Sequence, residues 1–483
     1  MPSTDEKLLK SQAFIAGEWI DAASGAVYPV TNPADGGLLG HVPDMDGDDA
    51  QRAIAAAEAA LPAWRFRTAA GRAALLMRWH DLILENAEDL ARIMTLEQGK
   101  PLSESRGEVK YGAAFLQWFA EEGRRVYGDV IPSPAHDRRL LAIKQPIGVA
   151  ALITPWNFPL AMLTRKAGAA LAAGCTVVAK PAEDTPLTAL AFAELGQRAG
   201  IPAGVFNILT TQNPAPVGRA FTQSPAVRKL SFTGSTEVGK RLMADCAATV
   251  KRISLELGGN APFIVFDDAD LDAAVAGALA SKYRNSGQTC ICANRFLIQD
   301  GIYDTFAERF TAAVRELRVG PGMEDSGQGP LINQAAIDKV ESLVADAVAK
   351  GATALCGGKR HALGGTFYEP TVLTGVNEGM ACVQQEIFGP VAPLMRFQDE
   401  AEAIRLANDT PYGLAAYFYA RDIGRVWRVS EALEYGMVGV NQGLISTEVA
   451  PFGGVKESGL GREGSRYGID EYLEIKYLCM GGL

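Results

Sequence analysis

The sequence predicts an α/β protein with two open parallel sheets covered by helices. Short β-branched runs alternate with helical segments between residues 149 and 247, and a second such series extends from residue 262 to residue 440. Alternation of this kind favours parallel strands joined by right-handed crossovers. With 483 residues, the chain is long enough for two or three domains.

The first quarter of the chain is predicted to be mostly helical. Three of its segments are rich in alanine or carry apolar residues three and four positions apart, which is the spacing of one helix face: residues 50–64, 70–98 and 103–127.

The first α/β series follows this helical part. Four runs are expected to be buried strands: residues 149–153, 176–179, 206–209 and 229–232. Three segments between them are expected to be helices: residues 160–173, 186–199 and 236–247.

The second series begins at residues 262–266, and its last strand is expected at residues 439–440. No linker rich in Gly or Ser separates the two series, so the boundary is placed near residues 257–260 from the pattern alone. Residues 138–144 and 471–477 look like strands outside both series, and could pair as a small third element.

Composition excludes several classes of protein. The net charge of −10 and the pI near 5.2 come without a basic stripe, so nucleic acid is not an expected partner. The uncharged residues 145–164 contain three prolines, which fits a strand, a turn and a helix start better than a membrane span. No secretory signal is visible, and seven scattered cysteines suit a reducing compartment, so we expect a cytoplasmic protein. The four histidines lie far apart, and no metal site is expected.

Two motifs resemble nucleotide-binding loops. Residues 459–464 match G-x-G-x-x-G by letter, but they follow a loop near the C-terminus, whereas the dinucleotide fingerprint follows a strand and opens a helix. A glycine-rich surface loop is the favoured interpretation there.

The second motif, GSTEVGK at residues 234–240, resembles a P-loop between a predicted strand and helix, and Asp267 resembles the acidic end of a Walker B strand. A P-loop NTPase is therefore the rival hypothesis. Arg241 stands where Mg²⁺ needs a Ser or Thr hydroxyl, which argues against hydrolysis. The N-terminus of such a helix could still bind the phosphates of a nucleotide.

Three segments carry residues suited to covalent chemistry: PWNFP at 155–159, LELGG at 255–259 and GQTC at 287–290. Each also has a structural interpretation. Asn157 could cap a helix that starts at Pro159, Glu256 could end a strand, and Cys290 could be an inert core cysteine.

In combination these segments resemble the aldehyde dehydrogenase superfamily, over nearly the whole chain and in the family's order. Four more segments support the resemblance: KPAE at 180–183, FTGS at 232–235, EIFGP at 386–390 and PFGG at 451–454. Segments at residues 163–166, 281–294 and 460–472 are most similar to the succinate-semialdehyde dehydrogenases. A catalytically inactive structural relative is disfavoured because Cys290, Glu256 and Asn157 are all present.

The resemblance implies a mechanism. Cys290 would attack the aldehyde, Asn157 and the Cys290 backbone N–H would hold the oxyanion, and Glu256 would activate the water that hydrolyses the thioester. Lys166 and Glu463 align with positions linked to positioning and proton relay.

The resemblance also assigns a site for NAD, with NADP as the alternative. Gly234 and Ser235 would face the pyrophosphate, and Glu183 beside the adenosine ribose would favour NAD by repelling a 2′-phosphate. The full set expected to bind the cofactor is Trp156, Lys180, Glu183, Gly234, Ser235, Gly239, Leu257, Glu386 and Phe388.

The expected substrate is a semialdehyde whose far carboxylate is bound by Arg165, Arg284 and Ser446. A guanidinium fork matches a carboxylate, although each arginine could instead lie on a solvated helix face. Glutarate semialdehyde competes with succinate semialdehyde, because one methylene changes the binding free energy by only about 1–3 kcal/mol.

The family fold implies two Rossmann-like α/β domains plus a small β element for oligomerisation. Residues 1–123 and 147–258 would bind the cofactor, residues 259–458 would be catalytic, and residues 124–146 and 471–483 would assemble a homodimer or homotetramer. Cys292, two residues after Cys290, could form a reversible disulfide with it, or could simply be a small apolar residue under the loop.

Overall fold

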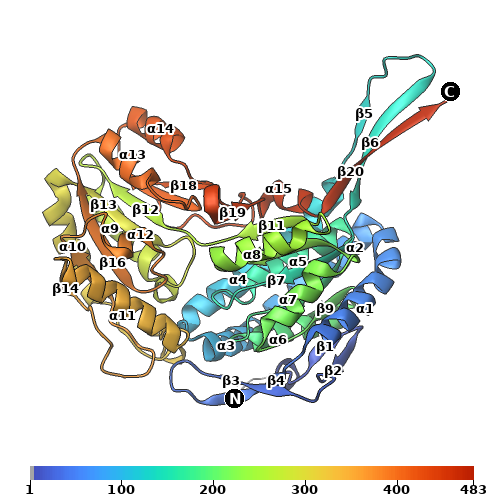
Figure 1. Cartoon of the computed structure of the whole chain (residues 1–483), viewed down its shortest axis with the longest axis horizontal. Coiled ribbons are helices and arrows are strands. Elements are labelled where there is room, and N and C mark those ends of the chain that lie inside the picture. The colour runs from blue at the N-terminus through green and yellow to red at the C-terminus, as the bar shows by residue number, and fades with distance from the viewer. Residues whose placement is uncertain (1–4, 483) are drawn as a thin grey trace.

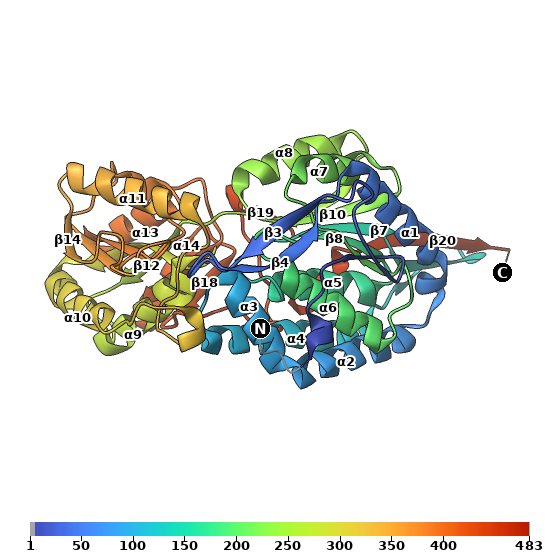
Figure 2. The same ribbon diagram turned by 90° about the horizontal axis from the view of Figure 1, so that it is seen from below.

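The computed structural model describes residues 5–482. Two sheets lie in two halves of the molecule, with a three-stranded arm that projects from one of them (Figure 1). The second view shows the same two halves side by side (Figure 2). Among the described residues, no helix is long and apolar enough to cross a membrane.

The first sheet has eight strands, and its five central strands are parallel. Their order is β11 (Arg252–Glu256), β10 (Val227–Thr233), β7 (Val149–Ile153), β8 (Thr176–Lys180) and β9 (Phe206–Ile208). The outer strands run antiparallel to their neighbours: β19 (Gly459–Leu460), β1 (Ala13–Ile15) and β2 (Glu18–Ile20).

Alternate residues of this sheet face two separate cores. In β7, Ala150 and Leu152 pack with the core under α2 (Ala69–Glu85), α4 (Leu102–Glu122), α5 (Ala161–Ala173) and α6 (Pro186–Ala199). Val149 and Ala151 pack with α1 (Gly47–Phe66), α7 (Pro214–Gln223) and α8 (Thr236–Ala247). The sheet is therefore buried on both faces, which explains its continuous apolar strands.

The second sheet has seven strands, of which only β14 is antiparallel to its neighbour. Their order is β14 (Thr353–Cys356), β15 (Thr371–Thr374), β16 (Val391–Phe397), β13 (Ala293–Gln299), β12 (Ala261–Val265), β17 (Ala415–Tyr419) and β18 (Met437–Val440). Two cores cover its faces. The associated helices are α9 (Leu271–Tyr283), α10 (Tyr303–Arg315), α11 (Gln334–Ala349), α12 (Ala381–Gln384), α13 (Glu400–Asn408) and α14 (Ile423–Ala432).

The two predicted outlying strands pair with each other. In the arm, β6 (Arg138–Pro146) lies between β20 (Leu473–Gly481) and the short β5 (Asp129–Ile131), and all three are antiparallel. Residues 471 and 472 precede β20, because α15 (Ser465–Asp470) occupies the preceding segment.

The first quarter is mostly helical, as predicted, but it also contains four short strands before its helices, including the hairpin of β3 (Val27–Thr31) and β4 (Leu38–Pro43). Two other sequence expectations were wrong. The predicted helix at residues 70–98 is two helices, since α3 (Ala87–Gln98) starts after a break at Asn86. The expected surface loop at residues 459–464 is instead partly an edge strand, and Glu463 within it is buried.

Candidate active site

A cavity of about 340 Å³ at the carboxyl ends of the first sheet's strands brings most of the predicted site together. Three strands lead into it: β7 is followed by residues 155–157, β10 ends at Thr233 and is followed by Gly234 and Ser235, and β11 ends at Glu256. The second half contributes from the opposite wall. Nine predicted residues line the cavity: Trp156, Asn157, Gly234, Ser235, Glu256, Leu257, Cys290, Glu386 and Phe388.

The Asn157 side chain is buried and points to the turn that carries Cys290. Its Nδ2 donates to the Gln288 carbonyl at 3.1 Å, whereas its Oδ1 has no hydrogen-bond partner among the described residues. An amide nitrogen has two protons, so one remains for a ligand. The predicted role as a helix cap is not what this side chain does, since α5 starts later, at Ala161.

The Asn157 backbone is fixed by two donors from distant segments. Lys100 Nζ donates to the Asn157 carbonyl at 2.6 Å, and Asn285 Nδ2 donates to it at 3.0 Å. Lys100 also pairs with buried Glu108, which accepts from the Leu160 and Ala161 N–H groups at the start of α5.

Asn285 adopts a positive φ of 50° in the turn before Cys290. Asparagine tolerates this left-handed conformation better than most residues. Gln98 Nε2 donates to Asn285 Oδ1 at 2.9 Å, and Glu104 accepts from the Asn285 N–H at 2.8 Å. These bonds hold residues 284–290, the turn that leads to Cys290, against the loop that carries Asn157.

Glu256 is buried, and neither carboxylate oxygen has a hydrogen-bond partner among the described residues. Burial, and then the negative charge of Glu463, raise the pKa of the Glu256 carboxyl well above its ordinary value. Glu463 itself pairs with Lys166 and Arg165. A carboxylate with a raised pKa and free lone pairs is suited to take a proton.

Cys290 is partly exposed to the cavity, unlike an inert core cysteine. Burial of the sulfur, and then the Glu386 carboxylate, raise the pKa of its thiol to about 12, while Arg165 acts in the opposite direction. The free protein therefore holds a protonated Cys290 at neutral pH, and forming the thiolate requires a base.

Cys292 is buried and not bridged to Cys290 in this structure. Its Sγ donates to the Gly287 carbonyl at 3.3 Å and lies 3.8 Å from the buried Lys282 Nζ.

Predicted cofactor residues near the cavity lie in three places: at the start of α8, beside Gly259, and in the ring pair of Trp156 and Phe388. Ser235 caps α8, and a Cβ on Gly239 would overlap the Leu257 side chain, so Gly239 permits close packing and does not line the cavity. Glu386 accepts from the Gly259 N–H at 3.0 Å. The rings of Trp156 and Phe388 lie perpendicular, with centroids 5.5 Å apart.

Lys180 and Glu183 lie beyond this cavity. Their charged groups pair at 3.1 Å, and Glu183 is 44% exposed, so its carboxylate is accessible to solvent. Glu183 lines a neighbouring cavity that shares Ile332 and Asn333 with the first.

The P-loop hypothesis fails on geometry as well as on Arg241. Asp267 follows β12 of the second sheet, whereas residues 234–240 follow β10 of the first. Lys240, the would-be phosphate lysine, pairs with Glu457 at 2.7 Å on the surface.

The predicted substrate residues are only partly brought together. Arg165 is 1% exposed, so it does not lie on a solvated helix face. Its Nη2 donates to the Tyr111 hydroxyl at 2.6 Å, and that hydroxyl hydrogen-bonds Ser446. Arg284 packs on the Phe158 ring at 5.2 Å, and its side chain has no hydrogen bond or ion pair within residues 5–482.

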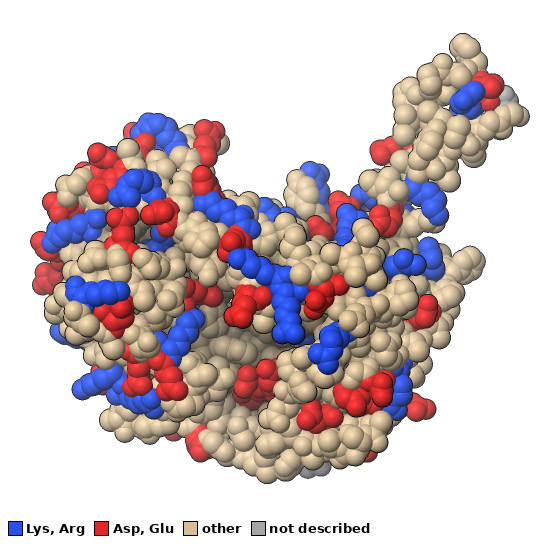
Figure 3. Space-filling view, viewed as in Figure 1, with Lys and Arg blue, Asp and Glu red and all other residues tan. Residues whose placement is uncertain are grey.

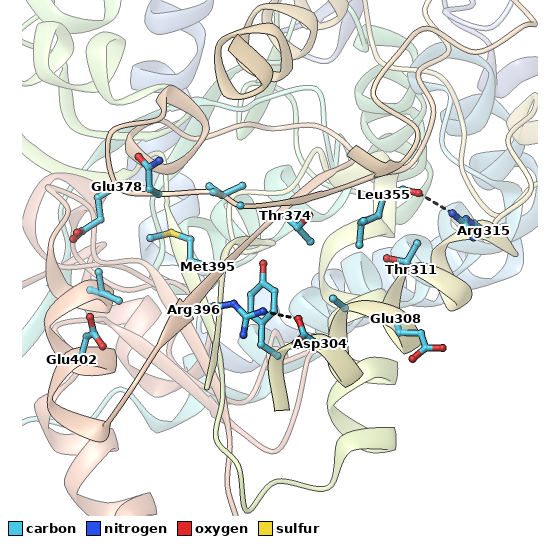
Figure 4. A pocket seen from close by; sticks show the side chains of 16 residues that line it. Asp304, Glu308, Thr311, Arg315, Leu355, Thr374, Glu378, Met395, Arg396 and Glu402 are labelled. Carbon is cyan, nitrogen blue, oxygen red and sulfur yellow. Dashed lines mark hydrogen bonds and ion pairs between the residues drawn. The ribbon is translucent and has the colours of Figure 1, made fainter. Parts of the chain in front are cut away.

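A larger cavity of about 860 Å³ lies beside α10, β15 and β16 in the second half (Figure 4). None of the predicted site residues lines it. Arg396 at its wall pairs with Asp304, and Arg315 donates to the Leu355 carbonyl (Figure 4). Its lining residues include no cysteine, serine or histidine.

The sequence profile described as the aldehyde dehydrogenase family matches residues 19–478. The chain belongs to this family. It is 61% identical over 484 residues to a glutarate-semialdehyde dehydrogenase of Pseudomonas aeruginosa, with both chains fully covered. It is also 61% identical over 482 residues, again with full coverage, to the Escherichia coli protein named succinate-semialdehyde dehydrogenase (NADP(+)) GabD.

A solved structure supports the family at the level of the fold. The crystal structure of succinate-semialdehyde dehydrogenase from Burkholderia pseudomallei matches with a TM-score of 0.99 at 61% identity, covering 100% of each chain. The predicted family and α/β fold are thus confirmed, and this member of the aldehyde dehydrogenase family is an NAD(P)-dependent oxidoreductase.

Sequence reasoning missed several residues of this site. Tyr111 and Lys100 contact predicted site residues but belong to no motif that was singled out, and Asn285 lies within the segment 281–294 but was assigned no role. Tyr111 and Lys100 lie in or beside the amphipathic helices of the first quarter, where periodicity marks burial and not polar contacts.

Proposed function

We propose that this aldehyde dehydrogenase oxidises succinate semialdehyde to succinate through a thioester on Cys290, with NAD as the preferred hydride acceptor. The observation that carries the substrate assignment is the buried Arg165 guanidinium, whose Nε has no partner among the described residues. Arg165 shares the single Glu463 carboxylate with buried Lys166, so one anion faces two cations, and a substrate carboxylate would offset the desolvation of the second. A neutral aldehyde would not.

The residues around the cavity fit a nicotinamide dinucleotide. The first turn of α8, which starts after the Ser235 cap, has N–H groups at a helix N-terminus that would face a pyrophosphate, whereas the Gly234 N–H already donates to the Glu256 carbonyl at 3.0 Å. Glu386 would accept from the hydroxyls of the nicotinamide ribose, and Phe388 and Trp156 would pack along the cofactor. When bound, the nicotinamide accepts a hydride.

In the first chemical step Cys290 Sγ bonds to the aldehyde carbon, the C=O π bond opens to give an oxyanion, and the thiol proton is released to solvent. The oxyanion accepts hydrogen bonds from the free Asn157 Nδ2–H and from the Cys290 backbone N–H. Losing one such donor typically lowers the rate by about 10²–10³. Departure of the hydride leaves an acyl thioester on Cys290.

Glu256 acts in the second step. Its unpartnered oxygens take a proton from water, the hydroxyl oxygen attacks the thioester carbon, and the C–S bond breaks to release the acid. Because the pKa of the Glu256 carboxyl is raised, its conjugate acid can return that proton to the leaving Cys290 sulfur.

The cofactor preference rests on Glu183. Its carboxylate can accept from the ribose hydroxyls but repels a 2′-phosphate, so NAD is favoured over NADP. The Escherichia coli relative is named for NADP(+), and this makes the ratio worth measuring directly. Glu183→Ser is expected to raise kcat/KM for NADP relative to NAD, and an unchanged ratio would remove Glu183 from this role.

Glutarate semialdehyde is the second candidate substrate. The Pseudomonas aeruginosa relative of the same identity is named for it, and the Arg284 side chain has no ion pair that would hold it in one position. A longer acid would reach the same guanidinium groups.

The domain roles follow the same proposal. Residues 1–123 and 147–258 bind the cofactor, residues 259–458 supply the nucleophile, and residues 124–146 and 471–483 assemble a homodimer or homotetramer. A cytoplasmic location stays a prediction.

The test is a spectrophotometric assay of succinate semialdehyde, glutarate semialdehyde and butyraldehyde with NAD and NADP. Arg165→Leu and Arg284→Leu should each raise KM for the two semialdehydes far more than for butyraldehyde, which has no charge. Equal losses for all three aldehydes would mean that the arginines only stabilise the fold.

A further inference from the structure

Tyr111 connects two residues that sequence reasoning placed in the substrate site. It lies on α4, Arg165 lies on α5, and Ser446 lies in the loop after β18. The Tyr111 hydroxyl accepts from Arg165 Nη2 at 2.6 Å and shares a hydrogen bond with Ser446 Oγ.

Packing against aromatic rings fixes the position of the Arg165 guanidinium. The Arg165 guanidinium lies over the Phe452 ring at 4.3 Å and the Phe115 ring at 5.0 Å. The Tyr111 ring in turn packs edge-on against Phe115 at 4.9 Å. The tyrosine and the guanidinium are therefore held in one relative orientation.

The protons of Arg165, Tyr111 and Ser446 determine which hydrogen-bond donors are left for a ligand. Arginine only donates, so the Tyr111 oxygen must accept from Arg165. Tyr111 and Ser446 have two hydroxyl protons between them, and their mutual hydrogen bond uses one. Neither hydroxyl has another hydrogen-bond partner within residues 5–482, so one O–H remains for a ligand acceptor.

We propose that Tyr111 is a positioning residue for substrate specificity, which couples Arg165 to Ser446 so that together they present one O–H donor beside a cation to the far carboxylate of the semialdehyde. The proposal rests on the anionic substrate proposed above. A neutral aldehyde tail has no acceptor for this donor, so the coupling acts only on the acid-aldehyde.

Tyr111→Phe removes the hydroxyl and keeps the ring that packs on Phe115. We expect KM for succinate semialdehyde to rise about tenfold or more, as for loss of a hydrogen bond within a charged network, with a much smaller change in kcat. KM for butyraldehyde should change less than about twofold on the same scale. The inhibition constant of the product succinate should rise in parallel with KM for the semialdehyde.

Ser446→Ala and the double variant test the coupling. If Tyr111 acts through Ser446, the double variant loses no more than the worse single variant, whereas independent residues would lose the product of the two factors. Tyr127→Phe is the matched control, because this tyrosine is 74% exposed and outside the site.

Different results would overturn the proposed substrate and the role of Tyr111. Wild-type enzyme that uses butyraldehyde as efficiently as succinate semialdehyde would overturn the proposed substrate, and the coupling with it. Wild-type preference for the semialdehyde, with Tyr111→Phe affecting both aldehydes equally or neither, would overturn the role of Tyr111 alone.

Discussion

Two carboxylates that line the candidate cavity, buried Glu256 and half-buried Glu386, differ in what surrounds them. Glu386 accepts a backbone N–H from Gly259, whereas Glu256 has no donor and lies near the negative charge of Glu463. Burial raises the pKa of the Glu386 carboxyl to about 7, while the pKa of Glu256 is raised well above its ordinary value by burial and by Glu463. One carboxylate is thus suited to a binding contact and the other to proton transfer.

The pKa of Glu386 predicts pH-dependent cofactor binding. Below pH 7 this carboxyl is protonated and loses its charge as an acceptor for ribose hydroxyls, so the Kd for NADH should fall as the pH rises through about 7. Glu386→Gln should remove this dependence. A fluorescence titration of NADH from pH 6 to pH 9, in steps of about 0.5, measures it. Identical pH profiles for the two proteins would contradict the assignment.

Cys292 predicts reversible oxidation of the active site. The two cysteines lie in a turn and not in a regular strand, where their Cβ atoms would be too far apart for a disulfide. We expect peroxide to inactivate the enzyme and dithiothreitol to restore it, because a strained bond is easily reduced and protects Cys290 from overoxidation. Cys292→Ala should keep basal activity and lose the recovery. Peptide mass spectrometry decides: inactive protein without a Cys290–Cys292 linkage contradicts the switch.

Among the elements, the start of α5 and the loop that carries Asn157 are held by one buried ion pair. Lys100, which lies between α3 and α4, bonds the Asn157 carbonyl, and its partner Glu108 caps the first N–H groups of α5. Asn157, the proposed oxyanion donor, is thereby positioned by residues more than 40 positions away in the sequence.

Lys100→Met leaves Glu108 buried without its cation, which typically costs about 3–5 kcal/mol of unfolding free energy. We expect a lower urea midpoint together with a lower kcat, because the Asn157 backbone loses a donor. Lys110→Met is the matched control, since Lys110 lies exposed on α4. Equal urea midpoints for the two variants would show that the pair does not stabilise this region.

The parallel strands were predictable because they are continuous apolar runs between helices, and β7 and α6 match the expected bounds. The strands β1–β4 were missed because they are short and lie at sheet edges or in a hairpin, where burial does not impose a clear pattern. The helix α7 was missed because Pro214 and Pro216 resemble a turn, although proline also suits a helix's first turn.

The residues of the candidate site can also be divided into those that the sequence could identify and those that it could not. Cys290, Glu256 and Asn157 lie in contiguous motifs that a resemblance can identify. The contacts of Tyr111 with Arg165 and Ser446 join three separate segments, and local spacing carries no information about such pairings.

At the scale of the whole molecule, the arm formed by β5, β6 and β20 stands out from both halves (Figure 1). The side of this arm that faces the viewer in the space-filling view is covered mostly by uncharged residues (Figure 3). Val130, Ile475 and Tyr477 on this arm are 82%, 74% and 59% exposed. Within residues 5–482, β20 pairs with β6 alone, so its other edge can pair with another chain.

The arm predicts that assembly depends on residues 471–483. Truncation before Glu471 should lower the native mass measured by light scattering after size exclusion. Because Tyr472 and Leu473 belong to the core, the sharper variant is Ile475→Glu with Tyr477→Glu, which keeps them. Removal of residues 482 and 483 is the control. A double variant that elutes at the parent's mass would contradict a role of this arm in assembly.

In the proposed reaction, Cys290 carries an acyl thioester, and Glu256 activates the water that hydrolyses it. The most direct measurement is peptide mass spectrometry of Glu256→Gln after acid quench, within the first turnover of succinate semialdehyde with NAD. We expect a burst of NADH and a succinyl adduct on the peptide that contains Cys290, because acylation proceeds and deacylation is slow. Steady turnover at the parent's rate would contradict the role of Glu256 in hydrolysis, and a burst of NADH without any adduct on Cys290 would contradict the thioester.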